Sequence, residues 1–473
     1  MNIWECLYER RSIREFERGR EVPQDVVEKI MRSAWYSLPA PAIYKPMYFP
    51  WRFIVNKMDQ DIKDRLGEAG KEVAATMFGS QFEFFGPGHL WYLPPATRLK
   101  VAEYATTGEL WQYPKDAWVN FIALVNKGWL DSLGQHSTQL DHIIQFQGFA
   151  IQNMWFVGHK YGVGAGYNGM PLLDERRREV IGERLGLPRS WDSCGCFSFG
   201  YAAHPRYYGP TRPGPEGMMF SEYWGNPYER LALRDKDYIG KVKLPDYDIE
   251  DVIKNMNYVE TFEEGPIPEW KIEKVIDAAL WGPLPEMFKQ WRGILVKDQA
   301  SKDFLQKIRS ERFGAQWSSL WPERMFSIAK GTPEEKMDEV EHILDYQLGN
   351  TLSEANALIV ISSSNGWQDI IETSNAATPQ FMRQIAVGCC IQNMMIAATA
   401  LDLGMDYDVI VTGDIRTREL MKDYFGIPDS VYPLGILALG KPGRKAKIER
   451  PSADTLFYDE YWGNFYPLRI NKD

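Results

Sequence analysis

The sequence predicts an α+β protein made of two tandem copies of one layered domain, in which a mixed sheet is flanked by helices. Two observations support this prediction. Short motifs of the first half recur in the second half in the same order and at a nearly constant offset. Within each copy, helical and strand-like segments alternate but are joined by long connections, which favours a mixed α+β layer over a parallel sheet of βαβ units.

Four pairs of motifs carry the repeat. They are YFPWRFIV (48–55) with FKQWRGILV (288–296), GFAIQNMWF (148–156) with GCCIQNMMI (388–396), LGLP (185–188) with FGIP (425–428), and EYWGN (222–226) with EYWGN (460–464). The offset is 240 residues for the first three pairs and 238 for the last. Chance similarity does not keep such a register. We therefore expect a first domain over 1–226, a charged linker over 227–248, and a second domain over 249–473.

Each copy has the same expected order of elements. In the first copy, an amphipathic helix with Trp4 and Tyr8 on one face precedes a cluster of arginines, and a second helix begins near Pro23. A proline-rich loop, a strand (50–56), a long helical or irregular stretch and an apolar strand (117–125) follow. The chain then continues as the helix that contains IQNM, a glycine-rich turn, another helix, a final strand (196–202) and a polar tail.

Composition excludes several classes of function. The net charge of −10 argues against affinity for nucleic acid or for anionic membranes. The five cysteines and six histidines do not form metal-ligand spacings, so we expect no metal site. No apolar run approaches the roughly 20 residues of a membrane helix, and charges within the first eleven positions argue against a signal peptide. We expect a cytoplasmic protein.

A basic cluster stands directly after the opening helix, within the sequence YERRSIREF (8–16). Its members are Arg10, Arg11, Ser12 and Arg14. One interpretation is the solvated end of a helix, with neighbouring glutamates as partners. The other is a cradle for a phosphate, because guanidinium groups bind phosphate in bidentate fashion and a hydroxyl can complete the site. The order of the other motifs favours the cradle.

In this order the motifs resemble those of the FMN-dependent nitroreductase superfamily. Its members have an RRSxRxF-like phosphate motif, a PW-containing loop and strand, an IQN-type helix, and a basic residue before proline in the tail. The matching residues here are Arg10, Arg11, Ser12, Arg14 and Phe16, then 50–55, then 151–153, and then Arg212 before Pro213. The resemblance covers both halves. It implies a nitroreductase-like fold in which the two copies form an intramolecular pseudo-dimer, because family members work as homodimers with FMN at the subunit interface.

The two copies differ at the positions that the resemblance assigns to FMN. In the second copy Asn257, Tyr258 and Glu260 replace Arg11, Ser12 and Arg14. The loop before the PW strand spans 12 positions in the second copy, the spacing usual in the family, and 17 in the first. The resemblance therefore implies about one FMN per chain. Its phosphate would be held by the arginines of the first copy, and its ring would be bordered by the loop of the second copy, which contributes Pro283, Leu284, Pro285 and Met287.

Two further groups of residues are candidates. The segment GAGYNG (164–169) matches the dinucleotide pattern GxGxxG, but it follows a helix and not a strand, so we do not expect a Rossmann site. The resemblance places Asn168 and Gly169 beside the reactive edge of the flavin, and a helix C-cap is the alternative. Aromatic residues are also abundant, and Trp35, Trp111 and Tyr113 are candidates for a wall against a flat substrate or for plain packing.

The resemblance implies an FMN-dependent oxidoreductase with NAD(P)H as the electron donor and a small, flat, aromatic acceptor. Nitro compounds, quinones and halogenated rings are the expected acceptors, and related members also dehalogenate or desaturate their substrates. Donor and acceptor would use the one flavin in turn, in a ping-pong reaction. The alternative is a protein of the same fold that binds or sequesters a flavin or a corrinoid-type cofactor without turnover. We expect a monomeric pseudo-dimer, although a higher oligomer is compatible with the sequence.

Overall fold

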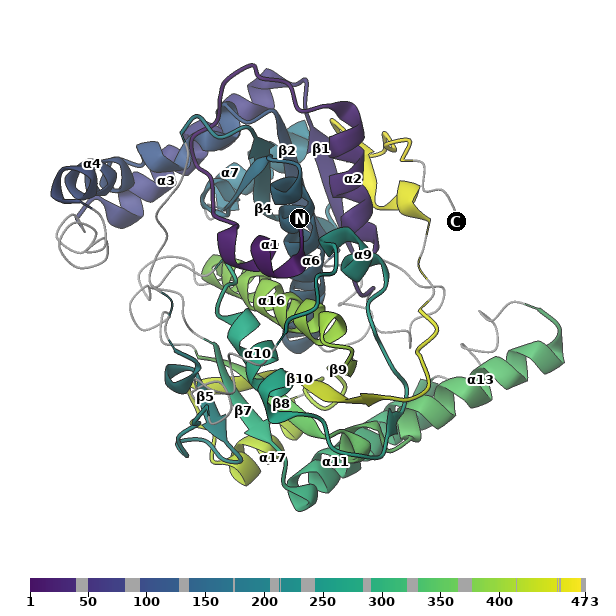
Figure 1. Cartoon of the computed structure of the whole chain (residues 1–473). Coiled ribbons are helices and arrows are strands. Elements are labelled where there is room, and N and C mark those ends of the chain that lie inside the picture. Colours follow the sequence, from purple (N-terminus) through teal and green to yellow (C-terminus); the bar gives the residue numbers. More distant parts are fainter. Residues whose placement is uncertain are drawn as a thin grey trace.

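The computed structural model describes residues 1–39, 50–80, 94–126, 136–172, 175–204, 212, 214–230, 243–283, 291–320, 331–364, 377–413, 415–448, 450 and 452–468. The chain forms two mixed sheets, each flanked by helices, which is the α+β class that the sequence predicts (Figure 1). The strands of the first half are β1 (Trp51–Asn56), β2 (Val119–Asn126), β3 (Gly164–Asn168), β4 (Trp191–Gly200) and β5 (Met219–Ser221). Those of the second half are β6 (Phe262–Glu263), β7 (Trp291–Val296), β8 (Ala357–Ser364), β9 (Gly404–Asp408), β10 (Val431–Pro442) and β11 (Phe457–Asp459).

The two sheets have corresponding strand orders. The first sheet runs β11-β1-β2-β4-β3, and the second runs β5-β7-β8-β10, with β6 and β9 both paired to β10. The central pairs β1–β2 and β2–β4 are antiparallel, as are their counterparts β7–β8 and β8–β10. Equivalent segments of the two halves therefore occupy equivalent places in the two sheets.

Each sheet takes its outer strand from the tail of the other half. Strand β11 pairs in parallel with β1. Strand β5 pairs in parallel with β7 (Figure 1). The glutamate of each EYWGN motif anchors the exchange: the Glu460 carboxylate accepts hydrogen bonds from the amides of Lys57, Met58 and Asp59, and Glu222 accepts from Lys297 and from Asp298. The repeated motif is thus a clamp between the halves, and the tail at 219–221 lies in the sheet of the opposite half.

The helices follow the expected order. Those of the first half are α1 (Ile3–Glu9), α2 (Gln24–Trp35), α3 (Gln60–Phe78), α4 (Pro95–Thr106), α6 (His136–Lys160) and α7 (Glu175–Arg184). Those of the second half are α9 (Ile249–Lys254), α10 (Glu269–Ala279), α11 (Gln299–Leu320), α13 (Pro333–Leu348), α14 (Thr351–Glu354), α16 (Ala377–Ala400) and α17 (Ile415–Phe425).

The glycine-rich segment expected as a turn is instead strand β3, paired antiparallel to β4. Its glycines serve close packing: a Cβ at Gly166 would lie 2.3 Å from the carbonyl oxygen of Ile13.

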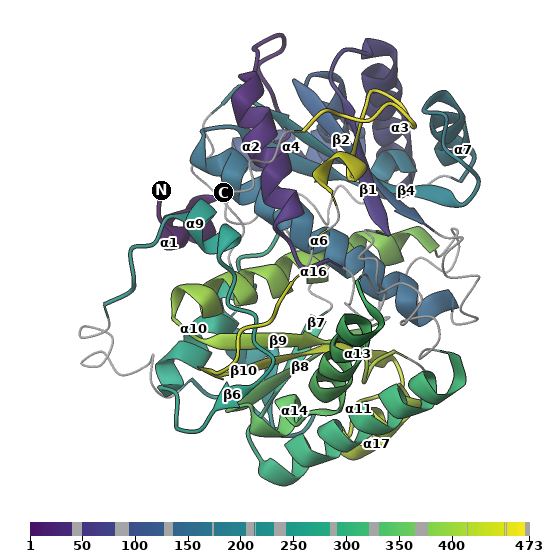
Figure 2. The ribbon, with the colours of Figure 1, turned by 90° about the vertical axis from the view of Figure 1, so that its right-hand side faces the viewer.

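The two long helices α6 and α16 cross at the centre of the molecule, between the two sheets (Figure 2). At the crossing the two IQN motifs bind each other reciprocally. Gln152 Nε2 donates to Asn393 Oδ1 at 2.7 Å, and Gln392 Nε2 donates to Asn153 Oδ1 at 2.8 Å. All four side chains are fully buried, where an amide group without a partner is costly. These hydrogen bonds therefore fix the register of the crossing.

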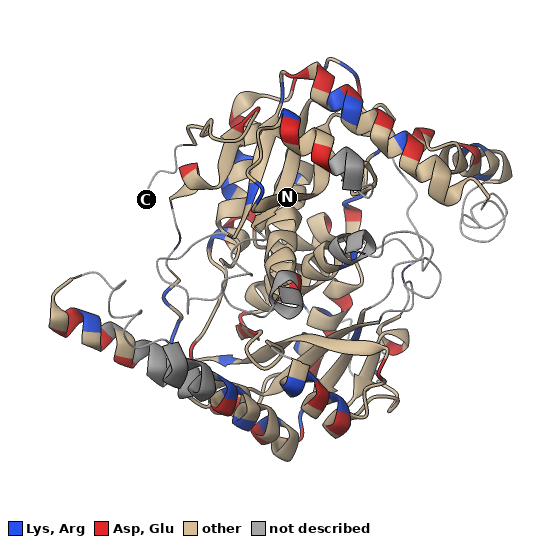
Figure 3. Ribbon diagram, turned by 180° about the vertical axis from the view of Figure 1, so that it is seen from behind, with Lys and Arg blue, Asp and Glu red and all other residues tan. Residues whose placement is uncertain are grey.

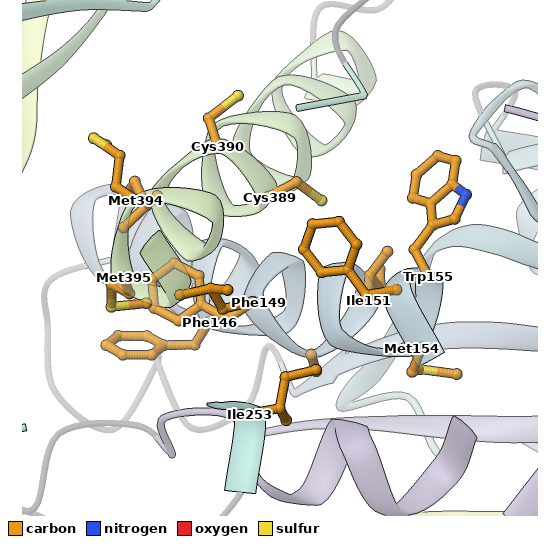
Figure 4. Close-up of a cluster of buried hydrophobic side chains, with 14 of the residues drawn as sticks. Phe146, Phe149, Ile151, Met154, Trp155, Ile253, Cys389, Cys390, Met394 and Met395 are labelled. Atoms are coloured by element: carbon orange, nitrogen blue, oxygen red, sulfur yellow. The ribbon is translucent and has the colours of Figure 1, made fainter. Parts of the chain in front are cut away.

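One hydrophobic core extends across both halves. It includes Phe149 and Ile151 of α6 together with Cys389 and Met395 of α16, which lie along the helix crossing (Figure 4). The charged residues lie mainly along the outer helices, and the ribbon around the crossing is largely uncharged (Figure 3). Because the halves share this core, we expect them to unfold together.

None of the helices described is long and apolar enough to cross a membrane. In the same part of the chain, no three His, Cys, Asp or Glu side chains are grouped so that they could hold a metal ion.

The helix crossing generates the first prediction. A Cβ at Gly388 would lie 2.3 Å from the carbonyl oxygen of Gln145, which belongs to the backbone of α6. Gly388→Ala should therefore lower the free energy of unfolding by about 1–3 kcal/mol. Gly182→Ala in α7 is the control, because its nearest contact would be an ordinary 3.6 Å and a helical alanine is favoured. Denaturant unfolding of both variants measures the difference, and equal stabilities would contradict the close crossing.

Candidate functional site

The arginine cluster lies against strand β3. Ser12 forms a parallel bridge with Ala165, and the Ile13 amide donates to the Ala165 carbonyl at 2.8 Å. Gly164 and Gly166 make this approach possible, because a Cβ on either would collide with Ile13. The segment therefore runs from the end of α1 along β3, and its Arg10 contacts the second half.

Arg10 is the most deeply buried cation of the cluster, with 2% of its side chain exposed. Its Nη2 donates to the Trp281 carbonyl at 3.2 Å, and its guanidinium lies 4.4 Å from the centroid of the Trp155 ring. Nε and Nη1 are buried and have no hydrogen-bond partner. A buried guanidinium with two unused donor atoms fits a site built to receive an anion.

Arg212 approaches the same loop from the tail of the first half. Its Nη1 donates to the Gly282 carbonyl at 3.1 Å, and its guanidinium lies 5.8 Å from the centroid of the Trp281 ring. The arginines at 10 and 212 thus contact two successive carbonyl groups of the second half. The structure brings both of them to the segment that leads into Pro283, which is half-buried. Leu284, Pro285 and Met287 lie outside the described residues.

The electrostatic field around Arg10 is positive. Burial and the neighbouring guanidinium of Arg212 lower the pKa of Arg10. Burial, together with Arg10 and Arg11, lowers the pKa of His159 to about 4, so this histidine is neutral near pH 7. Burial raises the pKa of Cys390 to about 12, so this nearby thiol does not offset the positive charge. An anion bound here would relieve the repulsion among these groups.

The other members of the cluster have different roles. Arg11 folds back, and its Nη1 donates to the carbonyls of Tyr8 at 2.6 Å and of Arg10 at 2.9 Å. Arg14 places its guanidinium 5.4 Å from the centroid of the Trp111 ring, and its Nε is buried without a hydrogen-bond partner. Arg14 therefore keeps a donor for a ligand, whereas one nitrogen of Arg11 braces the end of α1.

Asn168 and Gly169 are held by the protein itself. Asn168 is fully buried; its Nδ2 donates to the Trp111 carbonyl at 2.8 Å, and its Oδ1 accepts from the Met170 amide at 3.1 Å. Gly169 lies so close to α16 that a Cβ there would be 2.6 Å from the side chain of Met382. In the structure, Asn168 thus positions the segment that carries Trp111.

The three aromatic candidates lie in three different environments. Trp111 is half-buried, between the guanidinium of Arg14 and the ring of Phe78, whose centroid is 6.1 Å away. Tyr113 is buried and makes an edge contact with Phe16. Trp35 lies beside Arg450, in the counterpart region of the second half, and not with the arginine cluster. Only Trp111 stands directly beside an arginine of the cluster.

The counterpart region of the second half has different side chains at the matching positions. Met256 takes the place of Arg10, and Asn257 is tied to the Leu403 carbonyl at 2.9 Å. Glu260 forms an ion pair of 2.7 Å with Arg444. Where Asn168 stands in the first half, Asp408 is buried in an ion pair of 2.6 Å with Arg309. Among the described residues, a cluster of arginines that could receive a phosphate therefore exists in the first half only.

Sequence reasoning did not find Trp155, Trp281 and Gly282. Trp281 and Gly282 contribute backbone carbonyls, which no side-chain motif reveals. Trp155 did leave a signal in the repeat, because IQNMW in the first copy is IQNMM in the second. Arg10 and Trp155 form a cation–π pair, and methionines, Met256 and Met395, stand at both equivalent positions of the second half. Both members of the pair differ together between the halves, and this difference marks the site.

Comparison with known proteins identifies one domain. Residues 259–441 match the nitroreductase family. This range excludes the arginine cluster and Arg212, so the match does not depend on the residues of the candidate site. A curated relative described as a putative NADH dehydrogenase/NAD(P)H nitroreductase of Methanothermobacter thermautotrophicus is 22% identical over 217 residues, which are 46% of this chain and 85% of the relative.

Two solved structures are also similar. An FMN-dependent nitroreductase from Clostridium difficile R20291 is 16% identical, with 52% of this chain and 99% of that chain covered at a TM-score of 0.29. A putative NADH oxidase from Clostridium acetobutylicum is 20% identical, with 42% and 89% covered at a TM-score of 0.27.

The second prediction follows from the two donor atoms of Arg10 that have no hydrogen-bond partner. Arg10→Met places in the first half the residue that stands at the equivalent position of the second half. In protein without a bound anion, we expect the free energy of unfolding to rise by about 1 kcal/mol, because an uncompensated buried charge is removed. Affinity for phosphate-type anions should be lost in the same variant. Denaturant unfolding and sulfate titration measure both effects, and a less stable variant would show that Arg10 is structural.

Proposed function

We propose that the chain is an FMN-dependent oxidoreductase, formed by tandem duplication of a nitroreductase-type domain. The observation that carries the proposal is the buried Arg10 guanidinium, which contacts the second half through one nitrogen and leaves two donor atoms unused. A phosphate monoester is the kind of anion that a group of arginines binds with several charge-assisted hydrogen bonds. The nitroreductase match of residues 259–441 supports FMN as the molecule that carries this phosphate.

The residues of the chain would share the binding of FMN between the two halves. Arg10, Arg14 and Arg212 would hold the phosphate and the polar edge, and the segment at 281–283 would border the ring from the second half. When bound, the flavin supplies hydride and single-electron transfer, and the protein supplies binding and orientation. Trp111, which is half-buried beside Arg14, would offer an aromatic wall to a flat acceptor.

We further propose NAD(P)H as the electron donor and an aromatic nitro, quinone or halogenated compound as the acceptor, with the two using the site in turn. The relative from Methanothermobacter, described by a name that includes NAD(P)H nitroreductase, supports this donor. Because one chain would supply both the residues that border the ring and those that bind the phosphate, the flavin site would form within a monomer.

Anaerobic reduction followed by reoxidation tests the proposal. We expect protein loaded with FMN to be bleached by NADH or NADPH, and to regain its absorbance when a nitroaromatic, a quinone or a halophenol is added. The panel also distinguishes nitro reduction from dehalogenation through its products. Failure to bind FMN would overturn the proposal. A flavin that binds but is not reoxidised by any acceptor would instead indicate a flavin-sequestering protein.

Two matched arginines provide the control for this test. Arg212 and Arg450 both precede a proline in the two tails, but only Arg212 lies beside Arg10. Arg212→Met should weaken FMN binding by about 10- to 100-fold, since one charge-assisted hydrogen bond contributes about 1.5–3 kcal/mol. Arg450→Met should leave FMN binding and reoxidation unchanged. Equal losses in both variants would count against a site in the first half.

A further inference from the structure

The counterpart region of the second half keeps one arginine, Arg450, after the other phosphate-binding positions have changed. Its Nη2 donates to the Tyr36 carbonyl at 2.9 Å. Its guanidinium lies 5.6 Å from the centroid of the Trp35 ring and 5.9 Å from that of Tyr36. Both aromatic residues belong to the first half, so this region, like the arginine site, is built from both halves of the chain.

Arg450 takes over a contact that Arg10 makes in the first site. There, Arg10 donates to the Trp281 carbonyl; here, Arg450 donates to the carbonyl of Tyr36, which occupies the equivalent position at the end of α2. Met256 stands where a second arginine would be. With methionine at position 256, Arg450 is the guanidinium that contacts this carbonyl.

The positive charge of Arg450 is not compensated. Its Nε is buried and has no hydrogen-bond partner, and no carboxylate among the described residues forms an ion pair with it. Burial lowers the pKa of Arg450, and the hydroxyls of Tyr258 and Tyr36 oppose this shift. A guanidinium held in this way is stabilised when a carboxylate approaches its unused donors.

The surroundings of Arg450 indicate which anion fits. A phosphate dianion is disfavoured, because one arginine stands where the first half has a cluster. Glu260, which replaces Arg14, is paired with Arg444 and adds no positive charge. Asp406 adds a second carboxylate near Tyr258. A single negative charge is thus preferred to a double one. The rings of Trp35 and Tyr36 beside the guanidinium favour a flat, apolar body.

We propose that Arg450, with Trp35, Tyr36 and Tyr258, forms a second ligand site that binds a planar aromatic monocarboxylate. The site is separate from the proposed flavin site and does not depend on bound FMN. The two pseudo-equivalent regions of the chain would thereby bind different ligands: a phosphate ester in the first and an aromatic carboxylate in the second.

Equilibrium binding of benzoate to the full chain tests this proposal. We expect one saturable benzoate site in the wild-type protein, followed by calorimetry or by quenching of tryptophan fluorescence. Arg450→Met should weaken benzoate binding at least 10-fold, and Arg450→Lys should weaken it also, because lysine lacks the planar fork that matches a carboxylate. Sulfate, a dianion without a flat body, should not compete with benzoate at this site.

The Arg212→Met variant shows which of the two regions binds benzoate. This variant alters the proposed flavin site only, so benzoate binding should survive in it whether or not FMN is lost. If the Arg450→Met variant still binds FMN, it is folded. If FMN does not bind even to the wild-type protein, an unchanged melting temperature of the variant shows that it is folded. The proposal is overturned if benzoate does not bind, if its binding is lost in Arg212→Met but kept in Arg450→Met, or if sulfate displaces it.

Discussion

The crossing of α6 and α16 is the interaction on which the rest of the structure depends. Gln152, Asn153, Gln392 and Asn393 form two reciprocal hydrogen bonds in a fully buried environment, where misregistered amides would be left without partners. The amides also reach outward: Asn153 donates to the Ser33 carbonyl of α2, and Asn393 donates to the Ala278 carbonyl of α10. The crossing therefore positions the ends of both helices from which the two interface loops begin.

A symmetric scaffold carries an asymmetric distribution of charge. The strand orders, the exchanged outer strands and the EYWGN clamps correspond in the two halves, and this correspondence gives each half a region where segments from both halves meet. In the first region Arg10 and Arg212 contact the loop of the other half; in the second, Met256 and Arg450 stand at the matching positions. Because the two regions belong to one chain, a change in one of them is not repeated in the other. A buried charge without a partner lowers stability, and an anion bound beside Arg10 would offset this cost.

Much of the fold followed from the sequence because it rests on local periodicity and on the repeat. The helix near Pro23, the strands at 51–56 and 119–126, and the IQN helices were all predictable. Three features were not. The glycine-rich segment forms a strand, and its glycines leave room for the neighbouring Ile13. The outer strands are exchanged, and Glu222 and Glu460 accept hydrogen bonds from amides of the opposite half. The carbonyls of Trp281 and Gly282 face the arginines because of tertiary packing. All three depend on contacts between residues distant in sequence, which periodicity does not encode.

The central claim is that the two halves together build one phosphate-binding site and not two. The number of FMN molecules bound per chain tests it most directly, by titration of the FMN-free protein with FMN and by the absorbance of the saturated protein after gel filtration. The account predicts one FMN per chain, because Met256 and Glu260 stand where the second site would need arginines. Two FMN molecules per chain with similar affinity would contradict it.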